Sequence, residues 1–163
     1  MKPRTNKTRL ALLISIVLAI IGTGGLTFRS TNLAPALGPP EEVRIELGTA
    51  DDGYEFVPNK LEFERRRLYK LLITNPSSDT HYFSSPNLAA SVETRKVVTR
   101  NVSGLAAEVK GMIREIEIFP GGSAEWWLVP VLGGTFRDLH CSNVDGNGRK
   151  HVDLGMAATI KIN

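Results

Sequence analysis

The sequence predicts an all-β sandwich of about seven short strands, preceded by an apolar N-terminal helix. Two observations support this fold class. Apolar and polar residues alternate over short runs that turn residues separate at regular spacing, and no long run beyond the N-terminal segment has the period of an α-helix. The 163 residues include 15 Gly and 9 Pro, consistent with many turns. This length suffices for one domain with a hydrophobic core and an additional segment.

Residues 1–29 have the layout of a secretory signal peptide or signal anchor. Four positive charges precede an apolar run that begins at Leu10 and continues to Phe28. The small-x-small sequence at residues 34–36 resembles a cleavage site but lies far from this run. Counted to Phe28, the run has 19 residues, enough to cross a bilayer. We therefore expect export across a membrane, to a periplasm or an equivalent compartment, with residues 10–28 either cleaved off or retained as a membrane tether.

The net charge of +3 is unevenly distributed along the chain. Five of the 20 basic side chains and none of the 17 acidic ones lie in residues 1–36, which leaves 15 basic against 17 acidic side chains in the remainder. A slightly acidic domain behind a basic tail argues against a nucleic-acid binder. We expect no nucleic-acid partner.

Residues 30–42 are rich in Pro and form the expected linker, and residues 43–163 form the expected domain. Apolar residues alternate with polar ones over residues 43–47 and again over residues 56–63, the pattern of half-buried strands. Pro58 marks an edge or a bulge in the second run. A mixed apolar strand over residues 68–74 then ends in a polar loop.

Residues 87–111 are the least strand-like part of the domain. Residues 88–92 are compatible with a short helical turn and residues 96–98 with a short strand. Asn101-Val102-Ser103 fits a glycosylation acceptor, a pattern that often arises by chance. We expect this span to be a loop-rich excursion.

The β pattern resumes after that span. Isoleucines over residues 113–118 lead to a Pro-Gly-Gly turn, and a strand follows over residues 123–129. Trp126 and Trp127 in this strand must point to opposite faces, so we expect one of them in the core. A further strand opens near Gly134, and the last strand covers residues 157–162.

Soft metal ligands gather near the end of the chain. This stretch holds the only cysteine, Cys141, together with His140, His151 and Met156. One cysteine cannot form an internal disulfide, and a free thiol in an oxidising compartment is a liability unless it has a function. Among redox-active metals, copper suits a set of thiolate, imidazole and thioether best. The stretch therefore indicates a copper site, and a buried inert cysteine is the alternative.

The expected strands also place these residues near one another. Cys141 ends one strand and Met156 precedes the next, so the polar, Gly-rich residues between them form a surface loop at one end of the sandwich. His151 and Met156 return to the same rim, where we expect His151 to be the exit for an electron. His81 lies just past the end of another strand and supplies a second imidazole.

Several motifs together resemble the cupredoxin family, the plastocyanin-like and azurin-like blue copper proteins. The resemblance covers residues 43–163, and its most specific part is the spacing His-x3-Gly-Met at residues 151–156. It implies a Greek-key β-sandwich that holds one copper ion, cycling between Cu(I) and Cu(II), in a mononuclear type 1-like site. The supporting motifs are Phe56-Val57-Pro58, His81-Tyr82-Phe83, Pro120-Gly121 and Gly134-Thr135-Phe136. The implied copper ligands are His81, Cys141, His151 and, as a weak axial ligand, Met156.

The sequence departs from the family pattern in two places. Nine residues separate Cys141 from His151, a longer loop than in most small electron-transfer cupredoxins, and the run from Gly134 to Cys141 is one residue longer, which implies a bulge. Copper nitrite reductases have a similarly long loop and a histidine before the cysteine that serves a second copper. His140 lacks the imidazoles that such a site needs, because the chain has three histidines in total and Pro86 stands where those enzymes offer one. A second site shared between subunits is the minor alternative.

Four functions are consistent with this site. The preferred hypothesis is an exported one-electron carrier with a redox partner protein and no catalytic residues. The second is a copper-handling protein, a carrier or assembly factor with a copper-delivery partner, which a long flexible loop would favour. The third is an enzyme with a single open copper site, and the fourth is a metal-free interaction domain. A zinc site is less suitable, because methionine is not among the ligands that zinc usually takes.

Overall fold

The computed structural model describes residues 37–101 and 104–163. The expected signal or anchor segment and most of the expected linker lie outside these residues. Within the described part of the chain, no helix combines the length and the hydropathy needed to cross a bilayer. The first strand, β1 (Glu41–Leu47), starts two residues before the expected domain boundary at residue 43.

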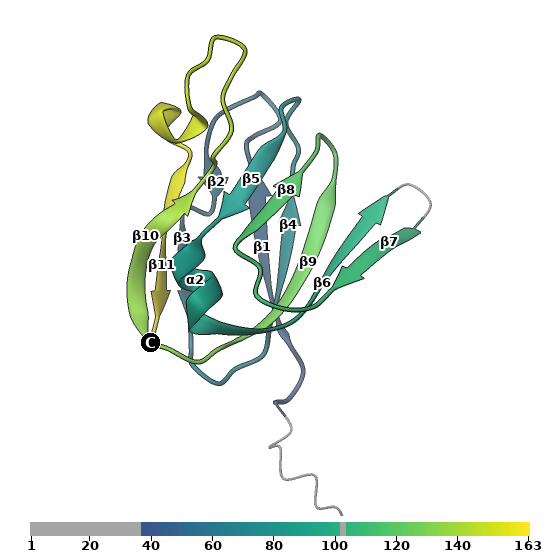
Figure 1. Cartoon of the computed structure of the whole chain (residues 1–163), viewed down its shortest axis with the longest axis vertical. Helices are drawn as coiled ribbons and strands as arrows, with labels where there is room; N and C mark the ends of the chain where they lie inside the picture. Colours follow the sequence, from purple (N-terminus) through teal and green to yellow (C-terminus); the bar gives the residue numbers. More distant parts are fainter. Residues whose placement is uncertain (1–36, 102–103) are drawn as a thin grey trace, which may run out of the picture. The chain divides into compact units, whose positions relative to one another are not determined.

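Two β-sheets form the described domain, which confirms the predicted β-sandwich (Figure 1). The sheets of this domain have six and five strands, more than the seven or so that the sequence predicted. In the first sheet, β1 lies between β2 and β4, and β9, β6 and β7 continue the order. In the second sheet the order is β3, β11, β10, β5 and β8. The strands of the first sheet after β1 are β2 (Phe56–Val57), β4 (Tyr69–Thr74), β6 (Val92–Asn101), β7 (Gly104–Val109) and β9 (Ser123–Pro130). Those of the second are β3 (Lys60–Phe63), β5 (His81–Ser84), β8 (Glu115–Ile118), β10 (Gly134–His140) and β11 (Ala157–Ile162).

The alternating run over residues 56–63 is divided between the two sheets. Its first part, β2, pairs antiparallel with β1, and its second part, β3, pairs parallel with β11. Pro58 lies between the two parts, where its missing N–H removes no bond from either sheet. The run predicted as one strand is therefore the place where the chain crosses from sheet to sheet.

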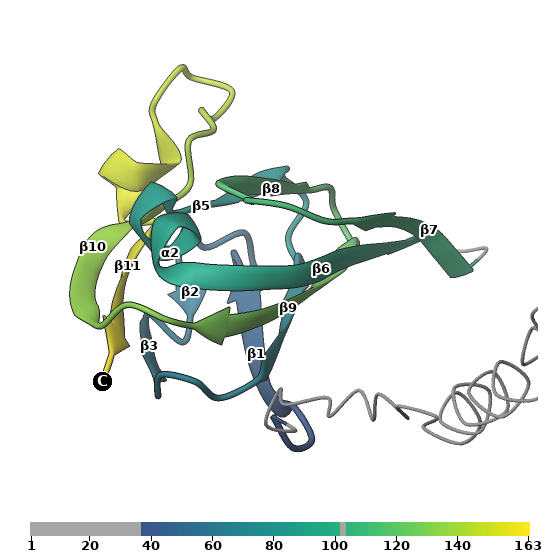
Figure 2. The same cartoon turned by 60° about the horizontal axis from the view of Figure 1, so that its bottom comes forward.

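The prediction of a loop-rich excursion over residues 87–111 is wrong. A short helix, α2 (Pro86–Ser91), opens this span, and Ser85 caps it by accepting a hydrogen bond from the Leu88 N–H. The ten-residue β6 then pairs antiparallel with both β9 and β7. The hairpin of β6 and β7 extends beyond the other strands (Figures 1 and 2). The pattern hides this strand because charged residues and a register shift between Thr94 and Lys96 interrupt its apolar alternation.

The core lies between the two sheets and is rich in aromatic rings. Trp126 is 2% exposed, and its indole N–H donates to the Thr94 hydroxyl at 3.1 Å. Phe83 contacts both Trp126 and Phe56 edge to face, with ring centroids 6.1 Å apart in each pair. Trp127, the next residue, is partly exposed on the outer face of the sheet. The expectation that one tryptophan belongs to the core is confirmed.

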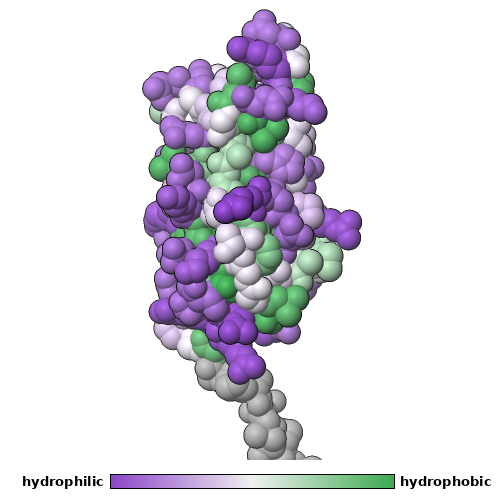
Figure 3. All heavy atoms as spheres, turned by 90° about the vertical axis from the view of Figure 1, so that its left-hand side faces the viewer, coloured by the Kyte–Doolittle hydropathy of each residue, from purple (hydrophilic) through white to green (hydrophobic). Residues whose placement is uncertain are grey.

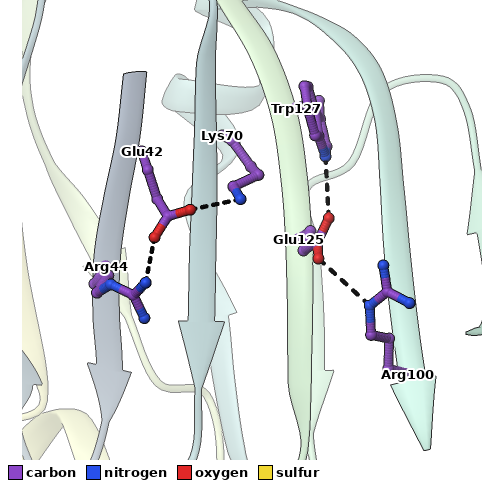
Figure 4. Close-up of polar contacts among 6 residues, drawn as sticks. All are labelled: Glu42, Arg44, Lys70, Arg100, Glu125 and Trp127. Atoms are coloured by element: carbon purple, nitrogen blue, oxygen red, sulfur yellow. Dashed lines mark hydrogen bonds and ion pairs between the residues drawn. The ribbon is translucent and has the colours of Figure 1, made fainter. Parts of the chain in front are cut away.

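The outer face of the first sheet carries charged side chains that bridge neighbouring strands. Glu42 pairs with both Arg44 and Lys70, and Glu125 accepts from Arg100 and from the Trp127 indole (Figure 4). Ion pairs at a protein surface contribute little to stability, so these pairs keep the face solvated rather than hold the fold together. Hydrophilic residues also predominate on the side of the domain that carries β10 and β11 (Figure 3).

The two adjacent tryptophans provide a matched test of this packing. We expect Trp126→Ala to lower the free energy of unfolding by about 3–5 kcal/mol, because it leaves a large cavity in the core. Trp127→Ala should cost about 1 kcal/mol, since its ring is partly exposed and contacts the Lys96 ammonium, 5.1 Å from the ring centroid. Denaturant titrations of both variants measure the difference. Equal losses would contradict this assignment of the two faces.

Candidate metal centre

Three of the predicted ligands meet at one end of the sandwich. His81 is the first residue of β5, Cys141 follows the last residue of β10, and His151 opens the short helix η1 (His151–Leu154). The two Nδ1 atoms lie 3.2 Å apart, and Cys141 Sγ lies 3.4 Å from Nδ1 of His151 and 3.8 Å from Nδ1 of His81. Within the described residues these three form the group of His, Cys, Asp or Glu side chains that could hold a metal ion.

The spacing of the three ligand atoms fits a metal ion at their centre. Metal–nitrogen and metal–sulfur bonds of about 2.0 and 2.3 Å in a flat trigonal set place the ligand atoms about 3.5 to 3.7 Å apart. The observed separations run from 3.2 to 3.8 Å. The arrangement of the donor atoms therefore suits a trigonal metal site of two imidazoles and one thiolate.

The backbone of Met156 lies next to the backbones of Cys141 and His151. Its N–H donates to the His151 carbonyl at 3.0 Å, and its own carbonyl accepts from the Cys141 N–H at 3.2 Å. Its side chain is fully buried and belongs to the hydrophobic core. The fourth predicted ligand thus sits at the point where the loop returns to β11.

Burial controls the protonation of all three side chains. Burial, with a further contribution from His151, lowers the pKa of His81 to about 4, and burial also lowers the pKa of His151. Burial raises the pKa of the Cys141 thiol, although the backbone N–H groups of Tyr82 and Asn143 act in the opposite direction. Near neutral pH both imidazoles are therefore uncharged, and a metal ion that takes the thiolate must displace its proton.

A glycine that the sequence reasoning missed makes room for His81. Gly48 follows β1 with φ of +73°, a left-handed conformation that favours glycine. A Cβ at this position would lie 2.6 Å from Nε2 of His81 and 3.1 Å from Cβ of Ser77. The sequence does show that Gly48 comes just after an alternating run. It does not show the contact with His81, because the two residues lie far apart along the chain.

The long loop between Cys141 and His151 is folded by its own hydrogen bonds. The Asp145 carboxylate, 4% exposed, accepts from the N–H groups of Asn147 and Arg149 and from the Arg149 guanidinium. These bonds, first among them the one from the Arg149 backbone, lower the pKa of Asp145 to about 2. Asn143 also donates to the Thr80 carbonyl, beside His81, at 2.7 Å. These hydrogen bonds give the loop a folded structure of its own.

His151 lies at the end of the sandwich, as expected, but it is completely buried there. Its side chain is 0% exposed, and among the described residues its buried Nε2 atom has no hydrogen-bond partner. Cys141 and His81 are equally buried, at 0% and 1%. Each candidate ligand of the group is thus shielded from bulk water.

Two further expectations concern the strand that leads to Cys141. The register between β10 and β11 shifts between Phe136 and Leu139, which confirms the expected bulge. His140 is partly buried, and its Nδ1 lies 2.8 Å from the Asp138 carbonyl oxygen. It stands apart from the group of His81, Cys141 and His151, as expected for a strand residue.

No protein-family model and no curated protein sequence matches this chain. Among solved structures, a multicopper oxidase from Pediococcus acidilactici is similar, with a TM-score of 0.53, 13% identity and coverage of 77% of this chain and 27% of the oxidase. A laccase from Pediococcus acidilactici Pa5930 is similar with a TM-score of 0.52 and 15% identity, over 79% of this chain and 29% of the laccase.

A less close match covers the whole of a small protein. Auracyanin A, described as a "blue" copper protein from Chloroflexus aurantiacus, shares 14% identity at a TM-score of 0.45, over 77% of this chain and 100% of auracyanin. The chain spans less than a third of the two longer enzymes. At these identities the likeness concerns the fold alone, and the described domain has a cupredoxin-like fold.

Proposed function

We propose that this protein binds one copper ion through His81, Cys141, His151 and Met156 and carries single electrons. One observation supports this most strongly: two imidazole nitrogens and a thiol sulfur lie within 3.8 Å of one another, buried at one end of a β-sandwich. Copper in such a site supplies one-electron chemistry, because both Cu(I) and Cu(II) accept a trigonal set of two His and one Cys with a weak axial Met.

In this proposal, the surrounding residues position the copper ligands and protect them from water. β5, β10 and η1 fix the three ligands, so the ligand atoms move little when an electron enters or leaves. The Tyr82 backbone N–H donates to Cys141 Sγ at 3.3 Å, a bond that disperses negative charge from the thiolate. Burial of the ligands keeps water away from the sulfur and from both imidazoles.

The folded loop supports a carrier over a copper-handling protein. A handling protein must release its ion to a partner, which a loop held by Asp145 and Asn143 opposes. The same burial supports electron transfer over catalysis, because each member of the His81, Cys141 and His151 group is closed to a substrate. We therefore propose a protein that is not itself an enzyme.

We also propose that this carrier works outside the membrane across which it is exported. The basic residues before Leu10 and the apolar run to Phe28 support export, with residues 10–28 serving as a tether if they are retained. A redox partner protein would then meet the domain on that side of the membrane. Comparing the mass of the N-terminus of the exported protein with the full sequence decides between a cleaved and a retained segment.

The visible spectrum of the copper-loaded protein tests the proposed site. We expect stoichiometric Cu(II) binding with intense visible absorption, since the buried thiolate donates charge to the metal. Cys141→Ala should abolish the colour, whereas His140→Ala should leave it largely intact. Colourless protein that binds one copper through Cys141 would favour the handling role. Failure to bind copper at all would exclude both functions.

A glycine pair tests whether the space beside His81 matters. Gly48→Ala places a methyl group against Nε2 of His81, so we expect copper affinity to fall roughly tenfold or more and the spectrum to change. Gly121→Ala is the matched control, because Gly121 has a similar φ of +70° and, within residues 37–101 and 104–163, no neighbouring atom lies within 4 Å of an added Cβ. It should cost stability but leave the copper spectrum unchanged. A similar spectrum for both variants would contradict the assigned role of Gly48.

The metal-free protein should lose stability as the pH falls. His81 has a pKa of about 4 when folded and an ordinary value of 6.5, so the unfolded chain binds a proton that the folded chain refuses. The free energy of unfolding should therefore decline as the pH falls from about 6.5 towards about 4, and His151 acts in the same direction. Denaturant titrations across this range measure the slope. The slope should be smaller in His81→Phe, and an unchanged slope would show that His81 is not its source.

A further inference from the structure

We propose that Tyr54 is the gate of the copper site. Its ring closes the path between His151 and solvent, so that copper enters or leaves only when this ring moves. The inference rests on the proposed copper function and adds a residue that the ligand motif does not contain. Tyr54 lies in the loop between β1 and β2, more than 90 residues before His151.

Tyr54 contacts both candidate imidazole ligands and still reaches the surface. Its ring centroid lies 4.5 Å from that of His151, with the planes tilted by 50°, and 6.2 Å from that of His81, nearly edge to face. The Tyr54 side chain is partly exposed, whereas His151 is completely buried. This makes the Tyr54 ring a cover over His151 that solvent touches from outside.

The closed position of the Tyr54 ring has an energetic cost at His151. His151 Nε2 is buried and finds no hydrogen-bond partner in the part of the chain that the structure describes, although a polar atom in this position gains by bonding to water. If the Tyr54 ring moved away, water would reach the imidazole and satisfy this atom. The unpaired nitrogen thus favours an open state, and the closed state needs contacts that hold Tyr54 in place.

A hydrogen bond at the far end of the ring supplies such a contact. The Tyr54 hydroxyl donates to Oδ2 of Asp79 at 3.0 Å, and bonds to a carboxylate are stronger than bonds between neutral groups. The Asp79 carbonyl is itself held by the Asn75 side chain at 2.7 Å. A second bond, from the Ser78 N–H to Asp52 at 2.8 Å, joins the same two loops. Tyr54 is therefore latched to the loop that precedes His81.

The gate can be tested first in the absence of copper. Diethyl pyrocarbonate modifies accessible imidazoles, and peptide mass spectrometry reports the extent at each histidine. In the wild-type chain we expect modification at His140 and protection at His151. Tyr54→Ala should raise the rate at His151 roughly tenfold and leave His140 unchanged, since His140 lies outside the covered site. Tyr54→Phe keeps the ring but loses the latch, so a smaller increase is expected.

Copper release provides the second test. With a chelator in excess, the rate of copper loss from the loaded protein should rise in the order wild type, Tyr54→Phe, Tyr54→Ala. Asp79→Asn should fall between wild type and Tyr54→Phe, because its amide oxygen still accepts from the Tyr54 hydroxyl without the charge of the carboxylate. Phe119→Ala is the control, because it removes an aromatic ring that is 63% exposed and lies in the turn bonded to Asn75. This control should release copper at the wild-type rate.

The outcomes separate the gate from the copper function itself. If the wild-type chain binds no copper but Tyr54→Ala still exposes His151 to the reagent, the proposed function fails and the cover remains. If copper binds and neither Tyr54→Ala nor Tyr54→Phe changes the modification of His151 or the release rate, the gate is wrong. Should Tyr54→Ala fail to fold, Tyr54→Phe and Asp79→Asn decide the question, and wild-type behaviour in both overturns the latch.

Discussion

The candidate site depends on the antiparallel pairing of β10 with β11. His140 pairs with Ala157 at the end of this ladder, and the Cys141 N–H extends it by donating to the Met156 carbonyl. Both ends of the loop that contains His151 are thereby fixed at one edge of the sheet. Once these ends are held, further loop residues add little to the entropic cost of closure. This explains how nine residues can separate Cys141 from His151 without separating their side chains.

Burial prepares the same site for a metal ion before any ion is bound. The imidazoles of His81 and His151 remain uncharged near neutral pH, so each already has one ring nitrogen without a proton and need not lose net charge to become a ligand. Cys141 is different, since its thiol becomes a ligand only as the thiolate. The folded protein thus supplies two imidazole ligands that are already uncharged, and one thiol that must lose its proton when the metal binds. Affinity for a metal should consequently depend on pH mainly through the cysteine.

Local sequence patterns correctly predicted strands that bury only one face. The alternation over residues 43–47 and 157–162 gave strands that the structure contains, and the motif with Cys141 and His151 identified side chains that come together. The pattern failed over residues 87–111, where β6 carries several charged residues and its register shifts in the pairing with both β9 and β7.

Contacts between distant residues could not be found from local patterns. Gly48 is needed because of His81, and Tyr54 covers His151, but neither relation leaves a trace in the spacing of residues along the chain. The hydrogen-bonded structure of the Cys141–His151 loop could not be predicted for a related reason. A polar, Gly-rich composition describes a mobile loop and a loop folded around Asp145 equally well, and the hydrogen bonds alone distinguish them.

The length of β1 sets how far the candidate site stands from the point where the preceding chain joins the domain. β1 begins at Glu41, and the residue after its last one is Gly48, which touches His81. Seven residues of extended strand span about 23 Å. The candidate site and the residue at which the preceding chain joins β1 therefore lie at opposite ends of this one strand.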